Sequence, residues 1–186
     1  VEELGITVDG LVFQPIASAL ATLEDDEMDL GVTLVELGSN TTNIAVYHGS
    51  ALRHSATIPI GSASITNDIA VMLQITKKEA EKIKINYASA LSSMSSNQLD
   101  IKYRPNRESK EKTISEQEVS QYVEARVQEI LQMIIKEISR ADIKDPLTYG
   151  IVMTGGGAEL RNISSLIERN LDVKVRKGKP KRIRRN

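Results

Sequence analysis

Three consecutive segments with the composition of β-strands constrain the fold of this chain more than any other feature. They are GVTLVELG (31–38), TNIAVYHG (42–49) and ALRHSATIPIG (51–61). Gly38 and Gly49 mark the turns, which predicts an antiparallel meander. Further along, the apolar run YGIVMT leads into three glycines and a helical pattern. A meander followed by a returning strand–turn–helix unit predicts an α/β lobe built on a mixed sheet.

Helical patterns occupy most of the remaining chain. Apolar residues recur at helical spacing in the segments 62–74, 76–91 and 115–143. Residues 92–112 are polar, with one weak strand signal at 99–103, and we expect them to belong to a smaller inserted subdomain. Near the two ends we expect a short strand at 10–15, a helix at 16–27 and a short strand at 172–176.

Composition excludes several classes of function. The chain has 186 residues and no cysteine, so it has neither a disulfide framework nor a cysteine zinc site. Two histidines, His48 and His54, are too few for most histidine metal sites. No apolar run reaches the roughly 18 residues of a membrane span, and the start does not resemble a signal peptide. We therefore expect a cytosolic location.

The residues 174–186 hold eight lysines and arginines and no acid, although the net charge of the chain is −1. Such a run can bind nucleic acid or anionic lipid. The alternative is a solvated basic end.

The glycines Gly155, Gly156 and Gly157 lie between an apolar strand and a helix. They would let the backbone approach a ligand closely and leave helix N–H groups open to an anion. A nucleotide phosphate or ribose would fit there, and the alternative is a tight turn without a ligand. The spacing matches neither the dinucleotide-binding fingerprint nor a P-loop.

Two further patterns suggest phosphate and sugar contacts. The turn at Gly38, Ser39, Asn40, Thr41 and Thr42 offers backbone and hydroxyl donors to phosphate, unless it is an ordinary hairpin tip. Glu36, just before it, could hold a hydrated Mg²⁺.

Glu81 and Lys84 lie on one helical face at i, i+3 spacing. The carboxylate could bind ribose hydroxyls, and the lysine could lie against adenine or a phosphate. The alternative is a solvated ion pair.

Together these segments resemble the bacterial FtsA cell-division proteins, within the actin/Hsp70/sugar-kinase superfamily. The most specific part is LRHSATIPIG joined to ITNDIA, because chaperones and sugar kinases lack it, and QPIASALA lies upstream of it as in the family. The resemblance covers essentially the whole chain, but only the second half of an FtsA. It implies an actin-like (ribonuclease H-like) ATPase lobe, with a mixed sheet, flanking helices and a small inserted α+β subdomain.

The resemblance also implies a nucleotide site. The residues 38–42 match the second phosphate loop, 155–157 the adenosine motif, and Glu81 with Lys84 the helix pair beside adenine and ribose. ATP and Mg²⁺ are the implied cofactors. Because the first phosphate loop would lie outside this chain, we expect the chain alone to bind ATP weakly.

By the same comparison, residues 1–61 and 114–186 form subdomain 2A, and residues 62–113 form the inserted subdomain 2B. The family polymerises into actin-like filaments and binds the C-terminal peptide of the tubulin-like protein FtsZ. It tethers FtsZ to the cytoplasmic face of the inner membrane at the division site, through a helix absent from this chain. No nucleic-acid partner is implied.

One departure from the family bears on catalysis. The family loop reads Asp-Ile/Leu-Gly-Gly-Gly-Thr-Thr-Asp, where this chain has Glu36 first and Asn43 last. An amide cannot act as a general base, so we expect ATP binding with poor hydrolysis. The alternative is an active ATPase or phosphotransferase of the same superfamily.

The basic segment IKYRPNR is a candidate docking surface for the FtsZ peptide. Lys102, Arg104 and Arg107 could meet an acidic peptide, with strand addition at the edge. The alternative is a solvated loop.

Overall fold

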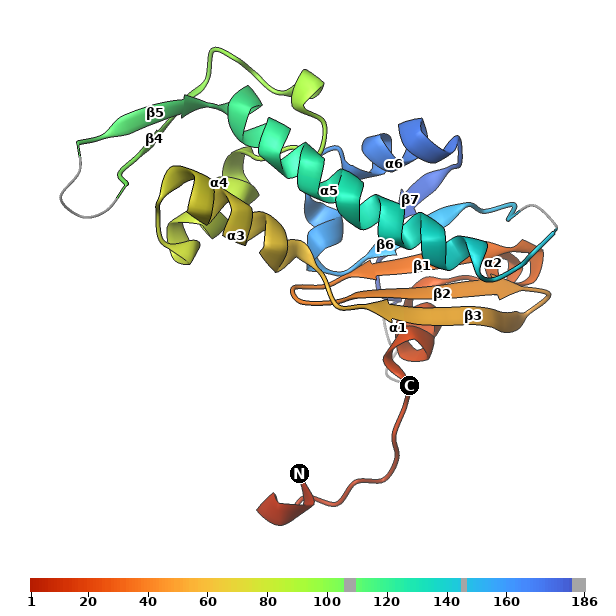
Figure 1. The fold of residues 1–186 in the computed structure, drawn as a ribbon. Helices are drawn as coiled ribbons and strands as arrows, with labels where there is room; N and C mark the ends of the chain where they lie inside the picture. Colours follow the sequence, from red (N-terminus) through yellow and green to blue (C-terminus); the bar gives the residue numbers. More distant parts are fainter. Residues whose placement is uncertain (106–109, 145–146, 182–186) are drawn as a thin grey trace.

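The fold is known from a computed structural model that describes residues 1–105, 110–144 and 147–181. Its main element is a five-stranded sheet of order β3-β2-β1-β6-β7 (Figure 1). The strands are β1 (Val32–Leu37), β2 (Thr42–His48), β3 (Ala51–Ile58), β6 (Ile151–Thr154) and β7 (Val175–Lys177). The first three pair antiparallel, whereas β1–β6 and β6–β7 pair parallel. The predicted meander and mixed sheet are therefore confirmed.

The sheet buries both faces because side chains alternate along β1. Val35 and Leu37 belong to the larger core, together with α5 (Glu116–Ser139) and α6 (Ile163–Leu171). Val32 and Leu34 belong to a smaller core on the other face, with α1 (Gln14–Thr22). The short helix α2 (Asp25–Leu30) follows α1, and α5 runs across the sheet on the opposite side from α1 (Figure 1).

A second group of elements lies at the N-terminal end of α5, beyond the sheet (Figure 1). It contains α3 (Ser62–Leu73), α4 (Lys77–Tyr87), the short turn η2 (Ser92–Met94) and a two-stranded antiparallel sheet of β4 (Asp100–Tyr103) and β5 (Lys112–Ser115). Capping boxes start α4 at Thr76 and α5 at Ser115. The inserted elements are thus helices plus a hairpin, while the boundaries of 2A and 2B stay a prediction.

The prediction for the N-terminal segment was wrong in two respects. Residues 10–13 form no strand, because Phe13 caps a helix that begins at Gln14 and has Pro15 in its first turn. The single helix expected at 16–27 is two, since the Glu24 capping box with Glu27 starts α2 afresh. A 3₁₀ turn, η1 (Glu2–Leu4), precedes them. Among the described helices, none is long and apolar enough to span a membrane.

Candidate functional site

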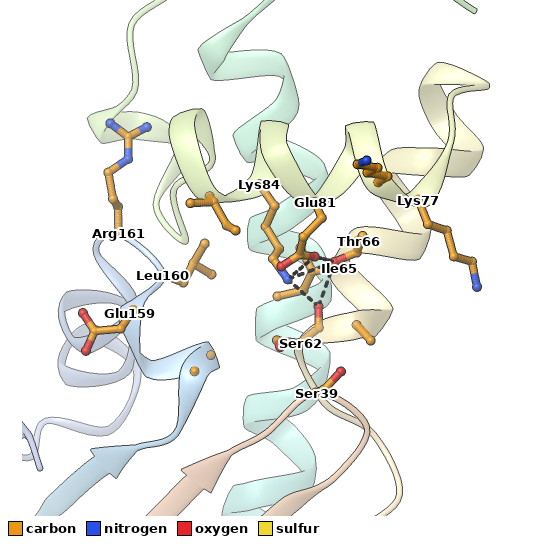
Figure 2. A pocket seen from close by; sticks show the side chains of 15 residues that line it. Ser39, Ser62, Ile65, Thr66, Lys77, Glu81, Lys84, Glu159, Leu160 and Arg161 are labelled. Carbon is orange, nitrogen blue, oxygen red and sulfur yellow. Dashed lines mark hydrogen bonds and ion pairs between the residues drawn. The ribbon is translucent and has the colours of Figure 1, made fainter. Parts of the chain in front are cut away.

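A pocket of about 710 Å³ opens between the glycine turn after β6 and the helices α3 and α4 (Figure 2). The β1–β2 hairpin contributes Ser39 to its rim. Both turns reach the pocket because β1 and β6 are adjacent parallel strands, with Glu36 opposite Thr154. Strands that run parallel end at the same edge of the sheet, where ligands of open α/β sheets bind. The two glycine turns therefore lie at one cleft.

The three glycines of the turn differ in what surrounds them. A Cβ at Gly155 would lie 2.6 Å from the Leu37 carbonyl oxygen, and one at Gly157 would lie 2.4 Å from Leu37 Cγ. A Cβ at Gly156 would meet nothing within 4 Å, and Gly156 lines the pocket. Packing against β1 thus requires Gly155 and Gly157, whereas Gly156 leaves its face open to a ligand. The 3₁₀ turn η3 (Gly156–Glu159) follows directly.

The hairpin tip is fixed by the start of α3. The N–H groups of Ser62 and Ala63 donate to the carbonyl oxygens of Gly38 and Ser39, at 2.9 and 2.8 Å. Within the described ranges, the N–H groups of Ser39 and Asn40 have no hydrogen-bond partner. Backbone donors at this tip are therefore free for an anion.

The remaining hairpin residues take other positions. Thr42 is completely buried, and its hydroxyl donates to the Ile60 carbonyl at 2.7 Å. The Thr41 carbonyl accepts from the Gly38 N–H at 2.9 Å and closes the turn. Of the five hairpin residues named from the sequence, Ser39 lines the pocket, whereas Gly38, Asn40, Thr41 and Thr42 do not.

Opposite the glycine turn, Glu81 and Lys84 form an ion pair of 2.8 Å, joined by two residues that the sequence analysis missed (Figure 2). Lys84 Nζ also donates to Thr66 Oγ1 at 2.9 Å and to the Ser62 carbonyl at 3.3 Å. The Thr66 hydroxyl donates to Glu81 Oε2. Burial favours the protonated carboxyl, but the hydrogen bonds from Lys84 and Thr66 outweigh it and lower the pKa of Glu81.

Glu36 lies at a neighbouring hollow of about 390 Å³, on the α1 side of the sheet. Its carboxylate accepts hydrogen bonds of 3.1 Å from Gln14, Ser18 and Asn43. Asn43 in turn accepts from the Thr57 hydroxyl at 2.8 Å. No signal in the sequence links Gln14 and Ser18 to Glu36.

Glu36 could hold Mg²⁺ only through water molecules bound to the ion. In the described part of the chain, no three His, Cys, Asp or Glu side chains gather closely enough to hold a metal ion. Glu36 alone would thus offer a carboxylate to a hydrated ion, the usual way in which Mg²⁺ is held with phosphates.

Part of the candidate peptide surface belongs to strand β4, and its basic side chains are exposed to solvent. Lys102 and Arg104 lie on and beside β4 and approach Glu111 at 3.4 and 3.8 Å. Both line a hollow of about 260 Å³, together with Lys82 and Asn86 of α4. Arg107 lies outside the described residues.

The basic run at the C-terminal end is partly neutralised by acids from distant segments. Arg176 forms a forked ion pair with Glu27, Lys177 approaches Glu159 at 3.1 Å, and Lys181 approaches Glu24 at 3.1 Å. These contacts weaken the nucleic-acid interpretation for residues 174–181.

Comparison with solved structures identifies the class of fold. MreB5 of Spiroplasma citri bound to ADP matches with a TM-score of 0.81 and 20% identity, over 96% of this chain and 57% of that one. A PilM–PilN type IV pilus biogenesis complex matches with a TM-score of 0.69 and 18% identity, over 95% of this chain and 44% of that one. The chain therefore has the fold of the actin-like ATPases.

Sequence comparison then gives the family. The family model described as "Cell division protein FtsA" matches residues 33–186. The FtsA of Pseudomonas aeruginosa is 37% identical over 97% of this chain and 43% of its own length, and that of Escherichia coli K12 is 33% identical over 97% and 44%. The chain belongs to the FtsA family of cell-division proteins, and it spans less than half the length of these relatives.

Proposed function

We propose that this chain is the nucleotide-side lobe of an ATP-binding, filament-forming cell-division protein, and that its main pocket holds the adenosine part of ATP. The observation that carries this proposal is that Gly156 and the Glu81–Lys84 pair line one pocket. An open glycine face suits a flat base, and a charged carboxylate suits ribose hydroxyls.

The hydrogen bonds give Glu81 and Lys84 different roles: Glu81 would bind the ribose, and Lys84 orients Glu81. An ammonium group has three donors, and Lys84 uses all three on Glu81, Thr66 and Ser62. Lys84 therefore orients the carboxylate and does not need to contact the nucleotide. Lys84 and Thr66 both bond to Glu81 Oε2, which leaves Oε1 for the ribose.

The triphosphate would extend from this pocket toward the hairpin tip. The free N–H groups of Ser39 and Asn40 are the donors placed to bind phosphate oxygens. Mg²⁺ would neutralise phosphate charge and be held through water by Glu36. Hydrolysis would be slow, because the Asn43 amide cannot accept a proton from the attacking water.

The nucleotide proposal is tested by titrating the isotope-labelled chain with ADP and following backbone NMR shifts, which detect millimolar binding. Shifts should concentrate at residues 155–161 and on α3 and α4. Gly156→Leu should abolish them, because the new side chain would project into the pocket from a Cβ that meets no other atom within 4 Å. Gly10→Leu is the matched control, since a Cβ there also meets nothing within 4 Å. Shifts absent in the wild type, or unchanged in Gly156→Leu, would contradict the proposal.

For partners, we infer that the hollow between α4 and β4 receives the acidic C-terminal peptide of FtsZ. The support is that three basic residues, Lys82, Lys102 and Arg104, line it with a single acid, Glu79. Self-association into filaments and tethering of FtsZ to the cytoplasmic face of the inner membrane at the septum complete the proposed role. The support for filaments is the actin-like fold, and the support for the septal location is membership of the FtsA family.

A further inference from the structure

One arginine joins the two walls of the main pocket. Arg161 follows the glycine turn, and its Nε donates to the Ala88 carbonyl at 3.2 Å. Its Nη2 donates to the Tyr87 carbonyl and to Glu116 Oε1. Arg161 thus ties the glycine-turn wall to the end of α4 and to the start of α5, although these segments are far apart in sequence (Figure 2).

The contacts suit an arginine for physical reasons. Tyr87 is the last residue of α4, where carbonyl groups lack partners within the helix and carry partial negative charge. A guanidinium is a rigid fork of five donors, so it can bind two carbonyls and a carboxylate at once.

Glu116 is the buried partner of the Arg161 side chain. Its side chain is 7% exposed, and it also accepts from the Ser96 N–H at 2.8 Å. Burial favours the neutral form, but the hydrogen bonds from Ser96 and Arg161 prevail and lower the pKa of Glu116. The backbone adds a second tie, because the Ala90 N–H donates to the Arg161 carbonyl at 2.8 Å.

We propose that Arg161 is a positioning residue that sets the distance between the glycine turn and α4, and so the affinity of the pocket for the adenosine part of a nucleotide. This inference rests on the proposed function. Without the hydrogen bonds of the Arg161 side chain, the two walls separate more often. The distance between the walls that suits the ligand (the competent width) is then less populated. Arg161 acts through the walls and need not touch the ligand.

The width can be measured directly because the chain has no cysteine. Spin labels at Lys78→Cys and Glu159→Cys would report the distance between the two walls, since both positions are exposed and line the pocket. Arg161→Ala should broaden the distance distribution in the absence of nucleotide. If the competent width falls to about one tenth of the population, ADP affinity falls about tenfold.

Arg176→Ala is the matched control. Its ion pair with Glu27 has side-chain exposures of 41% and 7%, against 47% and 7% for Arg161 with Glu116, but Arg176 lies outside the pocket wall. It should lose stability without changing the distance distribution or ADP affinity. An Arg161→Ala protein that behaves like Arg176→Ala in both measurements would overturn the inference.

Two further outcomes are kept distinct. If Arg161→Ala does not fold, Arg161→Lys replaces it, because lysine keeps the charge opposite Glu116 but lacks the fork; an unchanged width and affinity would again refute the role. If wild-type protein does not bind ADP, the proposed function fails, while the distance distribution without nucleotide still decides whether Arg161 sets the width.

Discussion

The three consecutive glycines after β6 should respond very differently to the same substitution. Gly157→Ala places a Cβ 2.4 and 2.6 Å from Leu37 Cγ and Cδ2, and Leu37 is 2% exposed. Optimal carbon contacts are about 3.5–4.0 Å, so the core would have to open by roughly 1 Å. Overpacking of this kind typically costs about 1–3 kcal/mol.

Gly155→Ala should cost more than Gly157→Ala. Gly155 has φ 84° and ψ 169°, a region that only glycine occupies readily, and forcing another residue into it costs about 1–3 kcal/mol. The clash is with a backbone oxygen of Leu37, which cannot rotate away. Gly156→Ala meets open space and should be neutral, or stabilising by up to about 1 kcal/mol through the unfolded chain.

The assay is urea unfolding followed by far-UV circular dichroism, since the chain has no tryptophan. With an unchanged m-value, the urea midpoints should decrease in the order Gly156→Ala, Gly157→Ala, Gly155→Ala. The free energies of unfolding of Gly156→Ala and Gly157→Ala should differ by about 2 kcal/mol. Equal midpoints for Gly156→Ala and Gly157→Ala would refute the packing argument, and with it the idea that Gly156 alone is free to serve a ligand.

Three other perturbations test separate parts of the structure. Thr33→Val should raise the free energy of unfolding by about 1 kcal/mol, because Thr33 Oγ1 is buried without a partner among the described residues; a loss of stability would contradict this. The lowered pKa of Glu116 contributes stability in full above the unfolded-state value of about 4.3, and that stability is lost as pH falls below it. Urea midpoints of Glu116→Gln should therefore drop less than those of wild type between pH 6 and pH 3, and parallel curves would refute this. Charge reversal at Lys102 and Arg104 should abolish binding of an FtsZ C-terminal peptide in fluorescence anisotropy, with Lys136→Glu as control, and unchanged binding would remove the docking surface.

The fold could be predicted where a local pattern matches a local structure. Alternating apolar residues and glycine turns gave β1, β2 and β3, because neighbours in sequence pair directly in a hairpin. The insertion of β6 between β1 and β7 has no such signature, since parallel partners are set by how the whole chain packs. Pro15 explains the error at 10–15, because proline in a first helical turn is also compatible with an extended segment.

Among the candidate site residues, the contact between Glu81 and Lys84 could be predicted because it is local in sequence. Glu81 and Lys84 lie three residues apart, so helical geometry alone places them together. Arg161 and Glu116 are 45 positions apart, and Arg176 and Glu27 are 149 apart, so no spacing rule relates them. The acidic partners of the basic run could not be predicted for this reason, because Glu24, Glu27 and Glu159 come from the start of α2 and from η3 across the fold. A polyanion that drew Arg176 away from Glu27, which is 7% exposed, would leave a buried carboxylate without its partner. The count of basic residues along the chain therefore overstates the positive charge that the described part of this segment leaves unpaired.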